Sequence, residues 1–245
     1  MPDRRSRPNL NDASTAFAIL AALLALLGGT IILTGYLLDI PALRGILRGW
    51  APMKPNTALC FILNGLALLL SQIPSVRFDR NKAARTGWSG FLALLLMLPI
   101  LVCLLTLGEY LFAGNLPIDA LLINERLAAP GNPGAFRMAP ESAISHILLA
   151  VAIWLNMHPS LARRRVMVSA FLSVMVVALA VSAMSTYFSP VLGMFGWFGL
   201  SVMAGDAAIL FMLLGTASFL IVCRQKTFSW ELGKTTTTGF ALGTV

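Results

Sequence analysis

Charge is scarce in this chain. Of its 245 residues only 11% are charged, whereas 58% are hydrophobic. A soluble domain of this length needs far more charged surface, so the composition excludes an ordinary water-soluble enzyme or binding domain. The hydrophobic residues form long uncharged blocks, without the amphipathic stripe of a soluble bundle or the alternation of a membrane barrel. The sequence therefore predicts an all-α membrane protein.

Catalytic motifs are lacking as well. The sequence contains no H-E-x-x-H, no G-x-S-x-G, no phosphate-binding glycine loop, no dinucleotide fingerprint and no kinase or cyclase signature. Its three cysteines, Cys60, Cys103 and Cys223, lie in three different apolar blocks with no ligand-type spacing. We expect them to be buried small hydrophobic residues. The sequence predicts no enzymatic activity for this chain and indicates no particular cofactor.

Six apolar blocks are long enough, with their flanks, to cross a bilayer as helices. They span residues 16–38, 56–73, 91–113, 141–157, 166–188 and 206–223. A helix rises about 1.5 Å per residue and the hydrocarbon core is about 30 Å thick, so roughly 20 residues suffice. We expect one six-helix domain over residues 16–225. It would follow a basic cytoplasmic tail (1–15) and precede a cytoplasmic linker (226–245) that leads toward a further segment of a longer protein.

Basic residues gather beside one set of block ends. Of the 18 lysines and arginines, only five lie in the other loops, namely Arg44, Arg48, Lys54, Arg126 and Arg137. The positive-inside rule then predicts that both termini lie in the cytoplasm. The net charge of +8 indicates anionic lipid headgroups, not nucleic acid, as the partner of these loops. All five tryptophans lie near predicted helix ends, which is typical of an interfacial aromatic belt.

A motif recurs three times along the chain. It reads MKPNTALCFILNGLA from Met53, MAPESAISHILLAVA from Met138 and MAGDAAILFMLLGTA from Met203. The only three tyrosines, Tyr36, Tyr110 and Tyr187, each end the apolar block before one copy. The sequence predicts three helical hairpins, at about 16–73, 89–157 and 166–223, related by pseudo-three-fold symmetry. Within the motif, Asn56 and Asp206 are expected to cap their helices, and Glu141 to place a negative charge at a helix start.

Polar residues of the repeat gather at the outer helix ends, where a ligand could enter. The candidate ligand-binding residues are Tyr36, Tyr110, Tyr187, Glu109, Glu141 and His146. They would suit a small amphiphile such as a quinone or a lipid. A soft metal such as Cu(I) is the second hypothesis, with Met53, Met138, Met203 and His146 as candidate ligands. In the third interpretation the methionines only fill loop–helix junctions, the tyrosines anchor at the interface, and His146 bonds to a neighbouring helix.

The motif also carries a family resemblance. The strings MKPNTALCFILNGLALLL and RMAPESAISHILLAVAIWL resemble the MASE-type membrane-associated sensor regions at the N-termini of bacterial signalling proteins. The resemblance covers roughly residues 16–225 and implies a sensory input module ahead of a PAS, diguanylate cyclase or histidine kinase output. It also implies a homodimer formed through that downstream region. The alternative is a small transporter. The helix centres disfavour it, because they lack charged residues and have Asn64 as their main polar residue. A purely structural membrane anchor is a third option.

Overall fold

The computed structural model describes residues 10–45, 50–73, 86–112, 137–157, 163–188 and 202–224. Within these residues it contains six α-helices and one short 3-10 helix, and no strand. The helices are α1 (Leu10–Leu37), η1 (Pro41–Leu43), α2 (Pro55–Ser71), α3 (Thr86–Phe112), α5 (Pro140–Asn156), α6 (Arg163–Phe188) and α8 (Gly205–Cys223). The all-α prediction is confirmed for this part of the chain. Most of the basic tail, the linker and His158 lie outside the described residues.

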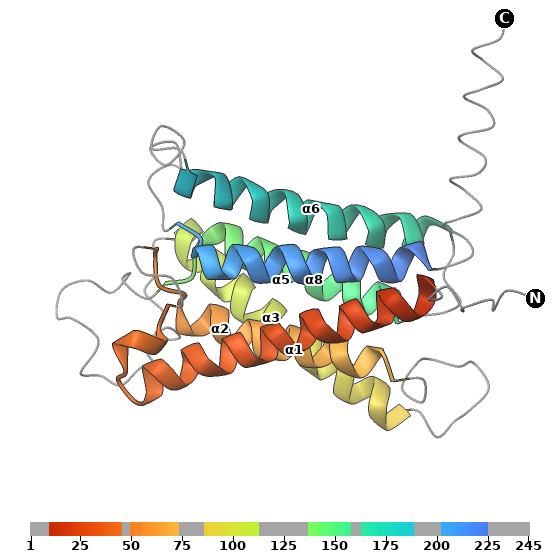
Figure 1. Ribbon diagram of the computed structural model, residues 1–245, viewed down its shortest axis with the longest axis horizontal. Coiled ribbons are helices and arrows are strands. Elements are labelled where there is room, and N and C mark those ends of the chain that lie inside the picture. Colours follow the sequence, from red (N-terminus) through yellow and green to blue (C-terminus); the bar gives the residue numbers. More distant parts are fainter. Residues whose placement is uncertain are drawn as a thin grey trace, which may run out of the picture.

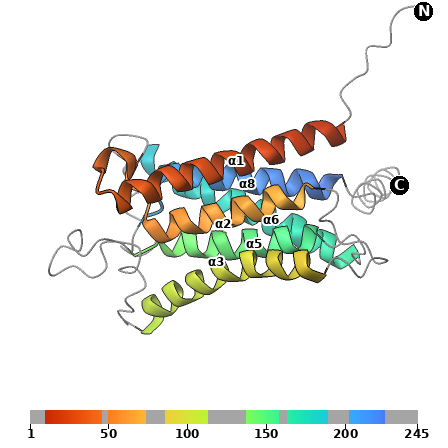
Figure 2. The ribbon, with the colours of Figure 1, turned by 90° about the horizontal axis from the view of Figure 1, so that it is seen from below.

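The helices form one elongated bundle and run alternately in opposite directions (Figures 1 and 2). The long helices α1, α3 and α6 end at the left of Figure 1, where the short helices α2, α5 and α8 begin. We call this end of the bundle the tyrosine end, because Tyr36, Tyr110 and Tyr187 lie in the last turns of the long helices. Each long helix packs against the short helix that follows it, so consecutive helices form hairpins.

Four helices are long and apolar enough to cross a membrane, judged by length and composition. They are Ala13–Leu37, Gly90–Phe112, Arg164–Phe188 and Gly205–Cys223. Large apolar side chains are exposed along the first three, among them Leu27 at 59%, Leu94 at 56% and Phe171 at 64% exposure. So large a continuous apolar surface is unfavourable in water and favourable in contact with lipid chains. The described helices are therefore those of a membrane protein.

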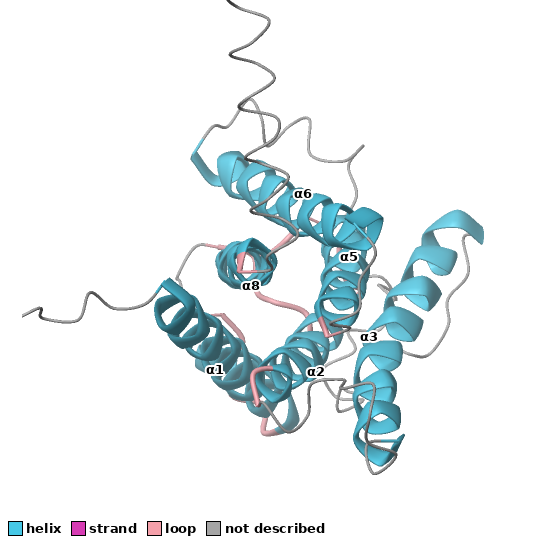
Figure 3. Cartoon of the chain, turned by 90° about the vertical axis from the view of Figure 1, so that its right-hand side faces the viewer, coloured by secondary structure: helices cyan, strands magenta, loops and turns pink. Residues whose placement is uncertain are grey.

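The short helices occupy the inside of the bundle. In the most apolar stretch of α8, 61% of the residues are buried. The corresponding shares in α1, α3 and α6 are 39%, 33% and 39%. Each long helix also contacts a second short helix: α1 packs on α8, α3 on α2 and α6 on α5. Figure 3, which looks along the bundle, shows α1, α2, α5, α6 and α8 around a common centre, with α3 outside α2 and α5.

The short helices begin in the same way. Pro55 and Pro140 are the first helical residues of α2 and α5, where proline loses no hydrogen bond, and Gly205 has the same place in α8. The capping residues are Lys54, Ala139 and Ala204, and none makes a side-chain cap. The expectation that Asn56 and Asp206 cap their helices is wrong, because each helix begins two residues earlier than such a cap requires, so both residues lie in the first helical turn.

Candidate functional site

The three tyrosines make the same hydrogen bond in all three hairpins. The hydroxyl of Tyr36 donates to the carbonyl oxygen of Met53 at 3.0 Å. Tyr110 donates to Met138 at 3.1 Å and Tyr187 to Met203 at 2.8 Å. Each bond ties the end of a long helix to the loop just before the next short helix. The tyrosine hydroxyls therefore have a structural role whatever else they bind.

A flat group covers each tyrosine ring. The guanidinium of Arg44 lies 5.2 Å from the Tyr36 ring centre, and that of Arg137 lies 5.1 Å from the ring of Tyr110. Both are within the range of a cation–π contact. The third ring, that of Tyr187, is covered by Trp50, stacked at 4.8 Å between ring centres.

Each of the two arginines also has an acidic partner. Arg44 pairs with Asp39, close to the exposed surface. Arg137 pairs with Glu109 at 3.3 Å, and the Glu109 side chain is only 1% exposed. Removing one partner of so deeply buried an ion pair would leave an uncompensated charge, which is strongly destabilising. Glu109, a candidate ligand-binding residue, is therefore held beside Arg137 and the Tyr110 ring.

Polar residues at the starts of the short helices are buried. Asn56, Glu141 and Asp206, each the second residue of its helix, are 0%, 6% and 5% exposed. Glu141 accepts a hydrogen bond from the backbone N–H of Met203, so it links the second hairpin to the third. Glu141 and Asp206 both lie close enough to Tyr187 to interact with it electrostatically. The structure thus places Glu141 near Tyr187, and it places Glu109 beside Tyr110 through their shared contact with Arg137.

His146 lies at the centre of the bundle, packed against two phenylalanines. Its ring centre is 4.6 Å from those of Phe61 and Phe211, and these two are also 4.6 Å apart. The three rings form an equilateral triangle built from α2, α5 and α8. His146 is fully buried, and its Nδ1 lies 3.1 Å from the amide nitrogen of Asn64 on α2. Since the amide donates, Nδ1 accepts, which places the proton of a neutral imidazole on Nε2.

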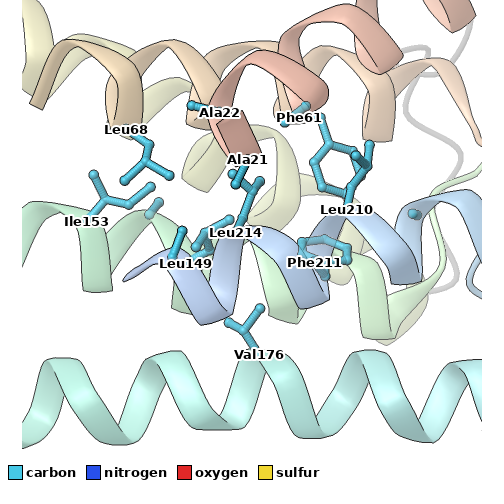
Figure 4. Close-up of a cluster of buried hydrophobic side chains, with 14 of the residues drawn as sticks. Ala21, Ala22, Phe61, Leu68, Leu149, Ile153, Val176, Leu210, Phe211 and Leu214 are labelled. Atoms are coloured by element: carbon cyan, nitrogen blue, oxygen red, sulfur yellow. The ribbon is translucent and has the colours of Figure 1, made fainter. Parts of the chain in front are cut away.

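Beyond the ring triangle the centre of the bundle is apolar. Leu149 and Leu214 lie one turn further along α5 and α8, followed by Leu68 and Ile153 (Figure 4). All four are at most 1% exposed. A separate polar cluster lies between α5, α6 and α8, where Ser169, Ser173 and Ser218 bond to one another or to Asn156.

Three sulfur-bearing side chains meet between α2, α3 and α5. Cys60, Cys103 and Met138 are each 0% exposed and pack in one cluster with Ala143. The Sγ of Cys103 lies 4.0 Å from the Sδ of Met138, and the thiols of Cys60 and Cys103 are within hydrogen-bonding reach of each other. Sequence analysis missed this cluster because it treated the cysteines separately. Among the described residues no group of three or more His, Cys, Asp or Glu side chains is placed to hold a metal.

The predicted metal ligands are not equivalent in the structure. Met53, Met138 and Met203 are all fully buried at the tyrosine end, but His146 packs against Phe61 and Phe211. Met138 has a sulfur neighbour, because its Sδ lies 4.0 Å from the Sγ of Cys103.

Comparisons with known proteins give this site no precedent: no family model, no curated protein and no solved structure matches the chain.

Proposed function

We propose that the chain is the membrane-embedded sensory input module of a bacterial signalling protein. Its six helices would cross the inner membrane as three hairpins around a pseudo-three-fold axis, with both termini in the cytoplasm. The tyrosine end would then face the periplasm, where a small amphiphile from the medium or the membrane could reach Glu141 and Tyr187. The chain itself would have no catalytic activity, and an output region, dimerised beyond it, would supply the response.

Pseudosymmetry has three independent supports. The same tyrosine-to-methionine carbonyl bond occurs in each hairpin. The rings of Phe61, His146 and Phe211, at matching positions of the motif, are mutually 4.6 Å apart. Each long helix packs on its own short helix and on one from a neighbouring hairpin. If the four apolar helices cross the membrane, α2 and α5 would cross it as well, because they pack alongside the long helices.

The observation that most favours a sensor over a transporter is the closed centre of the bundle. A transporter needs a binding site near the middle of the membrane that opens to each side in turn. Here the ring triangle and the leucine and isoleucine layers below it fill the middle. The buried carboxylates, those of Glu109, Glu141 and Asp206, lie instead at the tyrosine end, as an input that is read on one side requires. The resemblance of the motif to MASE-type sensor regions supports the same proposal.

The proposal is tested on the product of the whole natural gene. Its output, measured as cyclic dinucleotide formed or as phosphorylated histidine, should change when Glu141 is replaced by Gln. The matched control is Asp39→Asn, the same carboxylate-to-amide change at an exposed residue of the tyrosine end that is not proposed to contact the ligand. Two outcomes would overturn the proposal. One is an output that Glu141→Gln leaves unchanged under every growth condition, and the other is solute flux through proteoliposomes that contain the purified chain.

A further inference from the structure

The sulfur cluster at Cys60, Cys103 and Met138 combines three soft ligands in one buried place. Cys60 lies on α2, Cys103 on α3, and Met138 just before α5, so residues 78 positions apart converge. All three are fully buried, and apolar Ala143, Val102 and Ile147 surround them. Neither packing nor the proposed sensory role requires sulfur at all three positions, since leucine or alanine would fill the same space.

The spacing fits a metal ion with three ligands. A metal–thiolate bond is about 2.3 Å long, so sulfurs placed at the corners of a triangle around an ion lie about 4.0 Å apart. Cys103 Sγ and Met138 Sδ are 4.0 Å apart. The thiol of Cys60 is in hydrogen-bonding reach of Cys103, which supplies the second side, and Cys60 and Met138 pack in the same buried cluster.

Met138 is held in place from two directions. Its carbonyl oxygen accepts the hydrogen bond from Tyr110. The neighbouring Arg137 pairs with buried Glu109 and lies against the Tyr110 ring. These contacts fix the backbone from which the thioether reaches Cys103, and such supporting contacts are typical of ligand positions.

The equivalent places at the other hairpin junctions lack the sulfur set. Counting from the methionine and tyrosine of each copy, Cys60 corresponds to Ser145 and Leu210. By the same count Cys103 corresponds to Ala180 and Gly29. Of the three sulfur positions, only that of the methionine keeps the same residue in all three copies of the motif. The two cysteines are therefore extra to the shared architecture.

We propose that Cys60, Cys103 and Met138 form a binding site for a soft monovalent metal ion, Cu(I). Two thiols and a thioether are the ligand set that Cu(I) prefers. On binding, both thiols lose their protons, because the thiolate is the form of cysteine that binds metals, so two Cu–S bonds replace two S–H bonds and two protons are released. The thioether binds as a neutral ligand, and the complex of Cu(I) with two thiolates carries one negative charge. Zn²⁺ is disfavoured because structural zinc sites take four ligands.

The test uses the purified, reduced 245-residue chain in detergent under argon, with Ag(I) as a redox-inert probe and Cu(I) in competition with a coloured chelator. One tightly bound ion per chain is expected, and X-ray absorption should detect sulfur neighbours only. Met138→Leu should weaken binding by at least about tenfold, since residues that merely orient ligands already contribute that much. Cys60→Ser with Cys103→Ala, the residues of the second junction, should abolish it.

Matched controls separate this site from the other sulfurs of the chain. Met203→Leu removes the equivalent methionine of the third hairpin, and Cys223→Ser removes the remaining cysteine; both should bind as the original chain does. Met138→Leu conserves volume, so it remains informative if the double cysteine variant does not fold. Binding that survives loss of both cysteines would overturn the proposal. So would a Cys60–Cys103 disulfide that forms in air in a chain that binds no Ag(I). None of these measurements depends on the proposed sensory function.

Discussion

His146 and Asn64 form a polar pair beside the apolar layers at the centre of the bundle. Their contact at 3.1 Å joins α5 to α2, and both residues are 0% exposed. A single buried polar pair is a recognised way to fix which helix faces which, because any other pairing would leave its members unsatisfied. At the position of His146 the sister hairpins carry Phe61 and Phe211, whose rings have no such requirement. The pair therefore distinguishes the second hairpin from the others.

Replacing one member of this pair should cost more than replacing both. His146→Phe leaves the amide of Asn64 without its partner, and Asn64→Leu does the same to the imidazole. Each single change should destabilise the protein by about 1–3 kcal/mol, whereas apolar replacement of both partners can be nearly neutral. Unfolding in detergent at increasing denaturant measures all three variants. Destabilisations that simply add in the double variant would show that the two side chains do not interact.

Only glycine fits at position 205, because the Trp50 ring occupies the space that a Cβ atom would need. A Cβ atom at this position would lie 1.8 Å from the Cε3 atom of Trp50, whose ring also stacks on Tyr187. The first two hairpins have proline here, at Pro55 and Pro140. The departure of the third motif from the repeat thus has a steric cause, which no inspection of the motif alone could supply.

Gly205→Ala should therefore destabilise the protein by about 1–3 kcal/mol, the usual cost of overpacking. Thermal unfolding of the detergent-solubilised protein is the measurement. Gly90→Ala is the matched control, since a Cβ at Gly90 meets nothing within 4 Å. It should be neutral or stabilising, because alanine favours helix over glycine. If Gly205→Ala remains as costly after Trp50→Ala, the clash with Trp50 is not its cause.

Among the three short helices, α5 is the most polar, and its polar residues are well shielded. Glu141, Ser142, Ser145 and His146 all lie in its first two turns, and each is at most 6% exposed. Polar groups inside a membrane protein are tolerated where they face protein and not lipid. The position of α5 between α3, α6 and the other short helices provides that shielding. Its composition is therefore compatible with a helix that lies inside a membrane bundle.

The tyrosine bonds that close the hairpins should differ in strength. Tyr36 is only 1% exposed, whereas Tyr110 and Tyr187 are partly exposed. Tyr→Phe removes a hydrogen bond whose net contribution is about 0.5–1.5 kcal/mol, and the cost rises when the abandoned carbonyl is buried. We expect Tyr36→Phe to be the most destabilising of the three in thermal unfolding. Equal effects at all three positions would mean that burial of the Met53 carbonyl does not matter.

Local patterns of the sequence predicted the helices well, because hydrophobic length and the tyrosine–methionine register depend on neighbouring residues. All six predicted blocks match described helices, and the three tyrosines contact the three motif methionines. Contacts between distant segments were not predictable in this way. Asn64 meets His146 82 positions away, and Trp50 crosses from the first loop to Tyr187. The sulfur cluster was not predicted for the same reason, because metal sites were sought as ligand-type spacings within one segment.

Basic residues are concentrated at one end of the bundle, and under the proposed topology that end would face the cytoplasm. Arg163, Arg164, Arg165 and Arg224 lie at the end opposite to the tyrosines, as do most other basic residues of the sequence. Cytoplasmic loops are enriched in lysine and arginine because such loops resist transfer across the membrane. The arginines at the tyrosine end that the structure describes, Arg44 and Arg137, are in contact with carboxylates and tyrosine rings. They therefore add little free positive charge on that side.

Cysteine labelling on the two sides of α3 tests this orientation. Lys82→Cys precedes α3 and Asn115→Cys follows it, so the two positions flank one helix that is long and apolar enough to cross a membrane. In spheroplasts a membrane-impermeant maleimide should label position 115 at once and position 82 only after the membrane is permeabilised, because the basic loop is expected inside. Cys60, Cys103 and Cys223 are replaced in both proteins so that the signal comes from one site. Labelling of position 82 alone would invert the orientation and put the tyrosine end in the cytoplasm. Labelling of both positions without permeabilisation would show that α3 does not cross the membrane, and the six-span arrangement would fail with it.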